Sequence, residues 1–358
     1  MSDRPRGWVD RCLALAEIYR GRTSPNPIVG CVIEKDGVVL AEGAHRGPGT
    51  PHAEADALAK LGGRADGATL WVNLEPCNHH GRTPPCAPAV LASGVARVVV
   101  GARDPIADHA GGIDLLRAGG VGVEVLDDAA CVEANRPFYT WARCGRAAFT
   151  LKAGMSLDGR IATASGESKW ITSEAARADA HRLRDTHDAV LVGIKTVLAD
   201  DPALTTRIPN GRDAVRVVVD SQLRTPASAR VLPGGRTIIA TCASGALPGA
   251  ELWRFPGDRV PLDALARRLG EAGLLAVLVE GGATIHAALL AAGLADTLVF
   301  YAAPLLLGGT ALPVIGGPSA ATLAAAPRFR FLAPTAIGTD IRLTAVNDSA
   351  LLSSSSPW

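Results

Sequence analysis

Hydrophobic residues in the first part of the chain follow helical spacing and strand spacing in turn. Val9, Cys12 and Ala16 recur every three or four positions and predict a helix over about Trp8–Tyr19. Apolar runs on both sides of the Lys35-Asp36-Gly37 turn predict a hairpin. This alternation is typical of a layered α/β domain with mainly parallel strands. We expect strands at 28–33, 68–74 and 96–100, and helices that begin at Pro51 and after Cys86.

The pattern restarts near Arg143–Arg146, where we place a domain boundary. Ala148–Lys152 is a new apolar strand, and a polar, glycine-rich loop follows it. We therefore predict two α/β domains, at 1–146 and 147–350, and a disordered tail at 351–358 that contains a serine run. In the second domain we expect strands at 189–192, 215–219, 237–241, 276–279 and 297–301, and helices at 173–186, 262–272 and 285–292.

Composition narrows the class of protein. The chain has 358 residues, 48% of them hydrophobic, which suits two soluble domains with ordinary cores. A net charge of +1 and an aromatic content of 4% argue against a nucleic-acid partner. The opening residues lack a signal-peptide pattern, and no apolar run reaches the roughly 18 residues of a membrane span. We therefore expect a cytoplasmic protein with no membrane partner. Seven scattered cysteines, an odd number, argue against a disulfide framework.

Two short motifs contain residue types that bind zinc. His52 lies in Pro-His-Ala-Glu, and Cys77 and Cys86 lie in the later stretch from Glu75 onward. One imidazole and two thiols suit Zn²⁺, and three protein ligands leave the fourth tetrahedral position open to water. His-x-Glu followed by Pro-Cys and a second Cys is typical of zinc deaminases. We predict a catalytic zinc site made by these three residues. The alternative is that all three are ordinary core residues. Their common position at strand-to-helix junctions would then be a coincidence.

Glu54 is the candidate acid and base. Two thiolates cancel the formal charge of the ion, so such a site acidifies water less than an all-histidine site and gains from an added base. Glu54 would take a proton from the attacking water and deliver it to the departing amine, a contribution typically of about 10²–10⁴ in rate. Its offset from His52 argues against the alternative, a solvated carboxylate on a helix face.

Three further residues of this region have more than one possible role. His79 and His80 could replace a cysteine as ligands, but their loop is rich in proline and glycine and favours a place at the substrate entrance. Asn26 lies between two prolines and could present its amide to the edge of a heterocycle. A plain turn is the alternative for Asn26.

Longer stretches around these motifs resemble the bifunctional deaminase/reductase family of riboflavin biosynthesis. General cytidine deaminases carry Pro-Cys-x-x-Cys, whereas the long insert ending in Thr-Pro-Pro-Cys86 is more specific to this family. The resemblance runs in one order over nearly the whole chain. It rests on Thr23–Cys31, Pro51–Leu58, Glu75–Cys86, Lys152–Arg160, Ala164–Thr172, Thr196–Thr205 and Val279–Gly282.

The resemblance implies a fold and two reactions. The first domain would be a cytidine-deaminase-like three-layer α/β domain, and the second a dihydrofolate-reductase-like α/β domain. The first reaction would be zinc-dependent hydrolytic removal of an amine from a phosphoribosylaminopyrimidine, with one zinc ion per chain. The second would reduce the ribosyl group to ribityl with NADPH. The partner would be this small molecule, and a homo-oligomer would form through the reductase domain.

The residues alone leave the second site open. No Gly-x-Gly-x-x-Gly follows a strand, so a Rossmann fingerprint is absent from the sequence. An apolar strand instead ends in Glu280-Gly281-Gly282 before a predicted helix. Glycines allow close backbone approach, and a helix start attracts phosphate. A purely structural turn fits the same residues.

By resemblance, the second domain would contact the cofactor and the substrate at separate sets of positions. The dinucleotide would contact Gly154, Trp170, Thr196, Asp200, Gly282, Ala283, Thr284, Ile285, His286, Ala287 and Ala288. The substrate would contact Ser168, Arg184, Leu204, Arg207 and Glu280.

Chemistry supports the two arginines, because guanidinium groups bind phosphate bidentately. For Arg184 the alternative is a solvated charge on a helix. Lys152 would assist either phosphate binding or protonation.

One loop departs from the family pattern. The family usually shows Asp-Pro-Asn-Pro and then a basic residue between two glycines. Here Ile106 replaces the asparagine, and the basic residue is absent from 104–112. These two differences affect the way in which the first domain would hold the ribose phosphate. They leave the zinc motif intact. One alternative is an enzyme with a live deaminase and a degenerate reductase, or one that acts on another aminopyrimidine nucleotide. Another is a non-catalytic binding module in which zinc only stabilises the fold. Glu54 and the open fourth position argue against the module.

Overall fold

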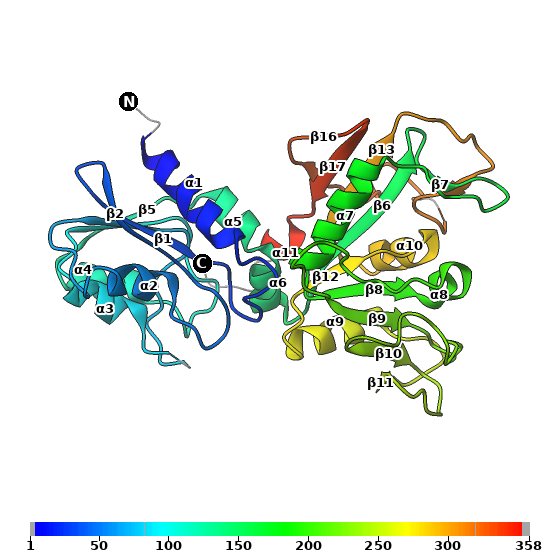
Figure 1. Cartoon of the computed structure of the whole chain (residues 1–358), viewed down its shortest axis with the longest axis horizontal. Coiled ribbons are helices and arrows are strands. Elements are labelled where there is room, and N and C mark those ends of the chain that lie inside the picture. Colours follow the sequence, from blue (N-terminus) through cyan, green and yellow to red (C-terminus); the bar gives the residue numbers. More distant parts are fainter. Residues whose placement is uncertain (1–3, 82, 319, 353–358) are drawn as a thin grey trace. The chain divides into compact units, whose positions relative to one another are not determined.

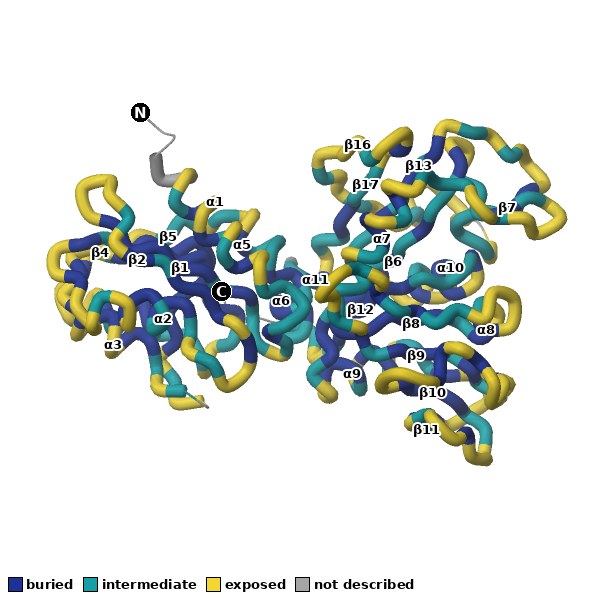
Figure 2. Tube along the Cα trace, in the orientation of Figure 1, coloured by how far each residue is buried: buried dark blue, intermediate teal, exposed yellow. Residues whose placement is uncertain are grey.

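The computed structural model describes residues 4–81, 83–318 and 320–352. The chain forms two compact units that divide between Cys144 and Gly145, just before the predicted boundary (Figure 1). Each unit has its own sheet and its own buried core (Figure 2). In the part of the chain that the structure describes, no helix combines the length and hydropathy needed to cross a membrane.

The first unit is built on a five-stranded sheet with the order β2-β1-β3-β4-β5. The predicted hairpin is confirmed: β1 and β2 pair antiparallel across a turn in which Asp36 and Gly37 have positive φ. β3, β4 and β5 run parallel to one another. The strands are β1 (Gly30–Lys35), β2 (Val38–Ala44), β3 (Thr69–Val72), β4 (Arg97–Val100) and β5 (Gly122–Val125).

Helices cover both faces of this sheet, which makes a three-layer domain. Figure 1 shows α1 and α5 on one side and α2, α3 and α4 on the other. Ala53, Ala57 and Val90 bury the second group of helices against strand residues such as Val72 and Val98. The helices are α1 (Arg4–Glu17), α2 (Ala53–Ala59), α3 (Cys86–Ala92), α4 (Gly112–Ala118), α5 (Ala129–Ala134) and α6 (Arg136–Cys144).

The second unit contains a ten-stranded sheet whose main path is β11-β10-β9-β8-β12-β6-β13-β17-β15, with β16 paired to β17. The strands from β11 to β13 along this path are parallel, and those beyond β13 are antiparallel. A separate pair joins β7 and β14. The strands are β6 (Ala148–Ser156), β7 (Arg160–Ala162), β8 (Ala189–Gly193), β9 (Val215–Val219), β10 (Thr237–Thr241), β11 (Glu251–Arg254), β12 (Ala276–Val279), β13 (Ala295–Ala303), β14 (Leu312–Pro313), β15 (Arg330–Phe331), β16 (Thr335–Ile337) and β17 (Asp340–Val346).

The parallel strands are apolar on both faces because each face is covered. On β12, Val277 and Val279 belong to a core that includes Leu265 of α9 and Leu289 of α10. Leu278 points to the opposite face, in a second core with α8. The helices are α7 (Glu174–Thr186), α8 (Ile194–Asp200), α9 (Leu262–Glu271), α10 (Ala283–Ala291) and α11 (Ser349–Leu352).

The predicted elements differ from the observed ones mainly at their ends. The first helix begins at Arg4 and ends at Glu17 rather than running to Tyr19, and α2 begins at Ala53 rather than at Pro51. The strand expected at 28–33 is shifted and occupies Gly30–Lys35. In the predicted tail, Leu351 lies in the short helix α11, and 353–358 lie outside the described residues. The sequence pattern missed the helices α4–α6, α8 and α11 and the strands β5, β7, β11 and β14–β17.

An ion pair between Arg146 and Asp296 connects the start of the second unit to its sheet. The carboxylate of Asp296, at the start of β13, accepts two hydrogen bonds of 2.8 Å from the guanidinium of Arg146. It also accepts a 2.8 Å bond from the backbone N–H of Phe149 in β6. Because Asp296 is only 3% exposed, water cannot replace these partners.

We predict that Asp296→Ala destabilises this unit by about 3–5 kcal/mol, because the largely buried guanidinium of Arg146 and the buried N–H of Phe149 both lose this carboxylate. Scanning calorimetry of the full chain would measure the shift in the melting transition. Asp263→Ala is the matched control, since its ion pair with Arg267 is exposed on α9 and should leave the transition unchanged. Equal melting temperatures for Asp296→Ala and the parent chain would contradict the prediction.

Candidate active sites

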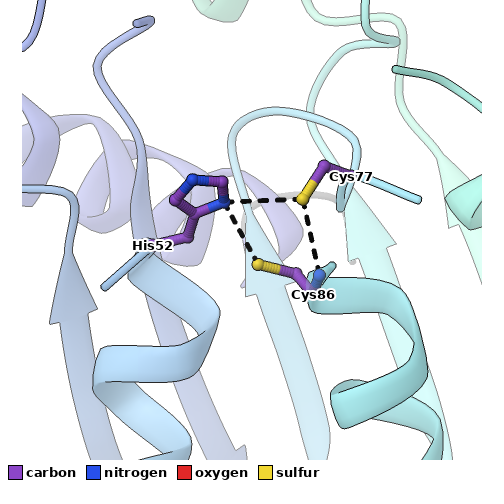
Figure 3. A group of neighbouring side chains, drawn as sticks. All are labelled: His52, Cys77 and Cys86. Atoms are coloured by element: carbon purple, nitrogen blue, oxygen red, sulfur yellow. Dashed lines mark hydrogen bonds between the residues drawn. The ribbon is translucent and has the colours of Figure 1, made fainter. Parts of the chain in front are cut away.

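Three side chains that are far apart in the sequence converge at one point of the first unit (Figure 3). Nδ1 of His52 lies 3.5 Å from Sγ of Cys77 and 3.4 Å from Sγ of Cys86. Tetrahedral zinc, with bonds of roughly 2.0–2.1 Å to nitrogen and about 2.3 Å to sulfur, places such atoms about 3.5 Å apart. The donor set and its spacing therefore fit a zinc ion.

The local structure explains why these residues meet. His52 is the residue that precedes α2, with extended backbone, and Cys86 is the first residue of α3. Cys77 follows β3 in the loop, and the backbone N–H of Cys86 donates to its sulfur at 3.4 Å. Two helix starts and the end of a strand thus meet at one edge of the sheet. The other ring nitrogen of His52 lies 3.2 Å from Oγ1 of Thr83, a contact that holds the orientation of the ring.

The two thiols share their charge unequally. A hydrogen bond from Cys86 lowers the pKa of Cys77 to about 4, and His52 lowers it further. The same bond to Cys77 raises the pKa of Cys86, and burial adds to that rise. A divalent cation bound here would displace the remaining proton, because thiolate is the form that binds metal.

Glu54 lies beside these three residues and is only 3% exposed. Burial, and secondarily the negative charge of Cys77, raises the pKa of Glu54 to about 7. A carboxyl group with a pKa near neutrality can both accept and donate a proton during turnover. This is the property that hydrolytic deamination needs from an acid and base.

A cavity of about 250 Å³ opens in front of these residues. Asn26 and His45 both line it, and a contact of Asn26 with a heterocycle stays a prediction. The carbonyl of Pro51 lies 3.2 Å from Nδ1 of His45 and must accept from it, so the other nitrogen accepts from the Asn26 amide at 3.0 Å. This arrangement fixes the nitrogen end of the amide. Other lining residues are His52, Glu54, Cys77, His79, Thr83, Asp104, His109, Phe138 and Trp141.

A buried carboxylate shapes the far wall of this cavity. Oε1 of Glu75 accepts from the backbone N–H groups of Gly111 at 3.1 Å and Ile113 at 3.3 Å. Its other oxygen accepts from the N–H of Asp104 at 3.3 Å. Glu75 therefore holds both ends of the 104–111 loop against the strand that leads to Cys77.

The second unit has a larger cavity, of about 580 Å³. Most of the residues predicted from the resemblance line it. They are Lys152, Gly154, Ser168, Trp170, Arg184, Thr196, Asp200, Leu204, Arg207 and Glu280. The structure thus brings together residues from β6, α7, α8 and the loops that follow α8 and β12.

A buried ion-pair cluster lies in this cavity. Arg184 donates to Glu280 at 2.5 and 3.0 Å and to the carbonyl of Thr205 at 2.7 Å. Lys152 lies 3.3 Å from the same carboxylate. Burial by itself would raise the pKa of Glu280, but Lys152 and Arg184 outweigh it and hold that pKa well below its usual range. The guanidinium of Arg184 therefore orients Glu280. Its observed partners are Glu280 and the carbonyl of Thr205, whereas its chemistry suggested a bidentate contact with phosphate.

Cationic side chains surround the rest of this cavity. Arg177 lies 4.5 Å over the ring of Trp170, whose indole is 69% exposed. Lys169, Arg207 and Arg230 add positive charge to the lining. Such a surface suits a ligand that carries several phosphates.

The segment 282–288 has a different environment. It begins α10, and none of its residues is among those that line the cavity. Gly281 is required by packing, because a Cβ there would come within 1.9 Å of Ile285. Ile285 and His286 are buried, and Nδ1 of His286 binds the carbonyl of Val314 at 3.1 Å. Thr284 and Ala288 are exposed, and Ala287 is half-buried.

Comparisons with known proteins agree with these two sites. Residues 6–102 match the family described as the cytidine and deoxycytidylate deaminase zinc-binding region. Residues 147–343 match the RibD C-terminal domain. The riboflavin biosynthesis protein RibD of Escherichia coli is 43% identical over 94% of this chain and 97% of its own length. The RibD of Bacillus amyloliquefaciens is 41% identical over 95% of each chain.

Solved structures give the same result. A RibD structure from Acinetobacter baumannii is 38% identical, with a TM-score of 0.85 over 95% of this chain and 98% of its own. The diaminohydroxyphosphoribosylaminopyrimidine deaminase/5-amino-6-(5-phosphoribosylamino)uracil reductase of Thermotoga maritima is 34% identical, with a TM-score of 0.86 over 95% and 97%.

Fold and sites together define a bifunctional enzyme in which a cytidine-deaminase-like domain with a zinc-binding region precedes a reductase domain. The chain belongs to the RibD family, the bifunctional deaminase/reductases of riboflavin biosynthesis. The fold class and family predicted from the sequence are confirmed.

Several residues of the two cavities were missed by reasoning from the sequence. In the second unit, Arg177 and His181 precede Arg184 on α7 at helical spacing, and this periodicity was a usable signal. His45 directly follows the end of β2, a weaker signal. His109, Phe138 and Trp141 come from a loop and a helix whose positions depend on the tertiary fold.

We predict that Glu54→Gln keeps zinc bound and lowers ammonia release about 10²–10⁴-fold, because the amide cannot move a proton. Metal analysis and an ammonia assay would measure the two properties on the same sample. Asp56→Asn is the matched control, since that carboxylate on α2 pairs with Arg46 and Lys60 and lines no part of the cavity. Normal turnover in Glu54→Gln would remove the proton-transfer role.

Proposed function

We propose that the first site hydrolyses the amine of 2,5-diamino-6-(5-phosphoribosylamino)pyrimidin-4(3H)-one. The second site would then reduce the ribosyl group of the product with NADPH, to yield 5-amino-6-(5-phosphoribitylamino)uracil. The convergence of His52, Cys77 and Cys86 beside the buried Glu54 carries this proposal. The name of the Thermotoga maritima relative supports the choice of substrate.

In the first site, one zinc ion per chain would be held by His52, Cys77 and Cys86 and would supply a Lewis acid that makes water more acidic. Glu54 accepts the proton that this water loses as its oxygen attacks the ring carbon. The same carboxyl group then gives the proton to the amine, which leaves as ammonia. A pKa near 7 suits both steps.

Other residues of the first cavity would hold the pyrimidine. The amide of Asn26, fixed through its nitrogen by His45, presents its oxygen as an acceptor for the edge of the ring. Phe138 and Trp141 supply apolar wall that keeps bulk water out. Thr83 keeps the His52 ring in place while substrate enters.

In the second site, bound NADPH would supply the hydride. The basic residues Lys169, Arg177 and Arg230 would offset the negative charge of its phosphates, and Arg207 would bind the phosphate of the substrate. Glu280, held ionised by its neighbours, would accept hydrogen bonds from the sugar hydroxyls. Lys152 lies next to Glu280 and would protonate the sugar oxygen as the ring opens. Gly154, Trp170, Thr196, Asp200 and the start of α10 remain the proposed dinucleotide contacts.

We also propose that copies of the chain associate through the reductase domain. Phe331 of β15 is 67% exposed and Ile341 of β17 is 49% exposed at the antiparallel end of its sheet. Apolar side chains in such a place suit a protein interface.

Product analysis tests the function directly. We expect the pure chain to convert the diaminopyrimidine substrate in two mass changes, the second only when NADPH is present. Cys86→Ser should lose the first change together with zinc, and it should still reduce 5-amino-6-(5-phosphoribosylamino)uracil. A single mass change in the parent chain under all conditions would refute the bifunctional proposal and favour a degenerate reductase.

We predict that Arg207→Ala raises the KM of the reductase step about 10- to 100-fold, because a hydrogen bond to a charged phosphate is lost. Initial rates of NADPH oxidation at varied substrate would measure the change. Arg182→Ala is the control, since that side chain is 71% exposed on α7 and does not line the cavity. An unchanged KM would refute the phosphate contact of Arg207.

A further inference from the structure

Two histidines from different loops stack against each other in the wall of the first cavity. The ring centroids of His79 and His109 are 3.8 Å apart, and the rings are within 12° of parallel. Both residues line the cavity that also contains His52 and Glu54. His79 belongs to the loop between the two cysteines, whereas His109 belongs to the 104–111 loop. The stack therefore joins the two loops that enclose the substrate space.

The backbone holds His109 in place for this contact. Its carbonyl accepts from the N–H of Asn78 at 3.1 Å, and its own N–H donates to the carbonyl of Ile106 at 2.9 Å. Glu75 binds the loop on both sides of it, at Asp104 and at Gly111. The ring of His109 is thus presented to His79 by a loop whose backbone is hydrogen-bonded on both sides of it.

The ring of His79 has a polar atom that the protein leaves unused. Nδ1 of His79 is buried, and no hydrogen-bond partner for it exists within the described ranges. A buried polar atom without a partner is costly unless a ligand or water satisfies it. His79 as a whole is half-buried and lines the cavity, so bound substrate meets the exposed part of its imidazole.

Charge also favours the stack. Burial lowers the pKa of His109, and the neighbouring His79 lowers it further. A neutral ring can lie flat against another imidazole without the repulsion between like charges.

We propose that His109 is a positioning residue for deamination. By stacking on His79, it holds the imidazole of His79 at the angle at which it hydrogen-bonds to the sugar-phosphate part of the substrate. This inference rests on the proposed function and extends it to one residue of the altered 104–112 loop. That loop lacks the basic residue expected between its glycines, and the stacked pair offers another polar group at the same wall.

The expected kinetic effect follows from the geometry. His109 touches neither the three predicted metal ligands nor Glu54 through any hydrogen bond in the described part of the structure, so the rate of the chemical step should not change. Loss of the stack would free the His79 side chain, and the substrate would then have to order it on binding. The cost should therefore appear in KM and not in kcat.

Five variants of the full chain test the proposal by ammonia release. His109→Ala should raise the deaminase KM about two- to tenfold at constant kcat, the range expected for loss of one aromatic pair. His109→Gln, which is polar but cannot stack, should match it, and His109→Phe should restore KM to within about twofold of the parent. In a His79→Ala background, His109→Ala should add no further change.

Each other result overturns the inference. An unchanged KM in both His109→Ala and His109→Gln would show that the stack has no role. Failure of His109→Phe to restore KM would mean that the imidazole makes a contact of its own. A further rise in KM when His109→Ala is added to His79→Ala would mean that His109 acts independently of His79.

Two controls separate folding and function from the role of His109. Zinc content and the rate of the reductase step should match the parent in every variant, which shows that the chain is folded. If His109→Ala fails this control, the comparison of His109→Gln with His109→Phe decides the matter. A parent chain that releases no ammonia would overturn the proposed function, a result that differs from any effect of these substitutions.

Discussion

Two buried thiols, a buried carboxylate and a half-buried imidazole lie together at one edge of the first sheet. So much potential negative charge in a small, largely water-free space is unfavourable unless a cation or shared protons balance it. In this structure a hydrogen bond from Cys86 lowers the pKa of Cys77 to about 4, and burial raises the pKa of Glu54 to about 7. The fold holds the ligand atoms of His52, Cys77 and Cys86 at distances that fit zinc, so a cation bound there would balance the negative charge. His52, Glu54 and Cys77 also line the surrounding cavity, so their positions form part of its wall.

Buried carboxylates organise both sites, but their neighbours give them opposite properties. Glu54 is buried and has the negatively charged Cys77 as a neighbour, so both effects raise the pKa of its carboxyl group. Glu280 is buried as well, yet Lys152 and Arg184 keep its pKa well below its usual range. The first carboxyl group is thereby suited to moving protons, and the second to accepting hydrogen bonds as a permanent anion. Burial alone therefore does not decide what a carboxylate can do.

A third buried carboxylate, that of Glu75, has a structural task. It sits just before the Pro76-Cys77 pair and binds backbone N–H groups at Asp104, Gly111 and Ile113. The strand that leads to a predicted metal ligand thus also holds the loop that forms the opposite wall of the cavity. This link explains how a loop with an altered sequence can still present a side chain, His109, to the site.

The sequence by itself determined the two-domain α/β organisation, the family and the identity of the candidate zinc ligands. These features depend on local periodicity and on motifs whose residue types are dictated by chemistry, as in His52, Glu54 and Cys77. Only the tertiary structure decided which other side chains face the sites. His45, His109 and Trp141 reach the first cavity, and Arg184 turns to Glu280, because loops and helices from distant segments pack beside them. No regular spacing along the sequence predicts such contacts, because they arise from the order of the strands in the sheet.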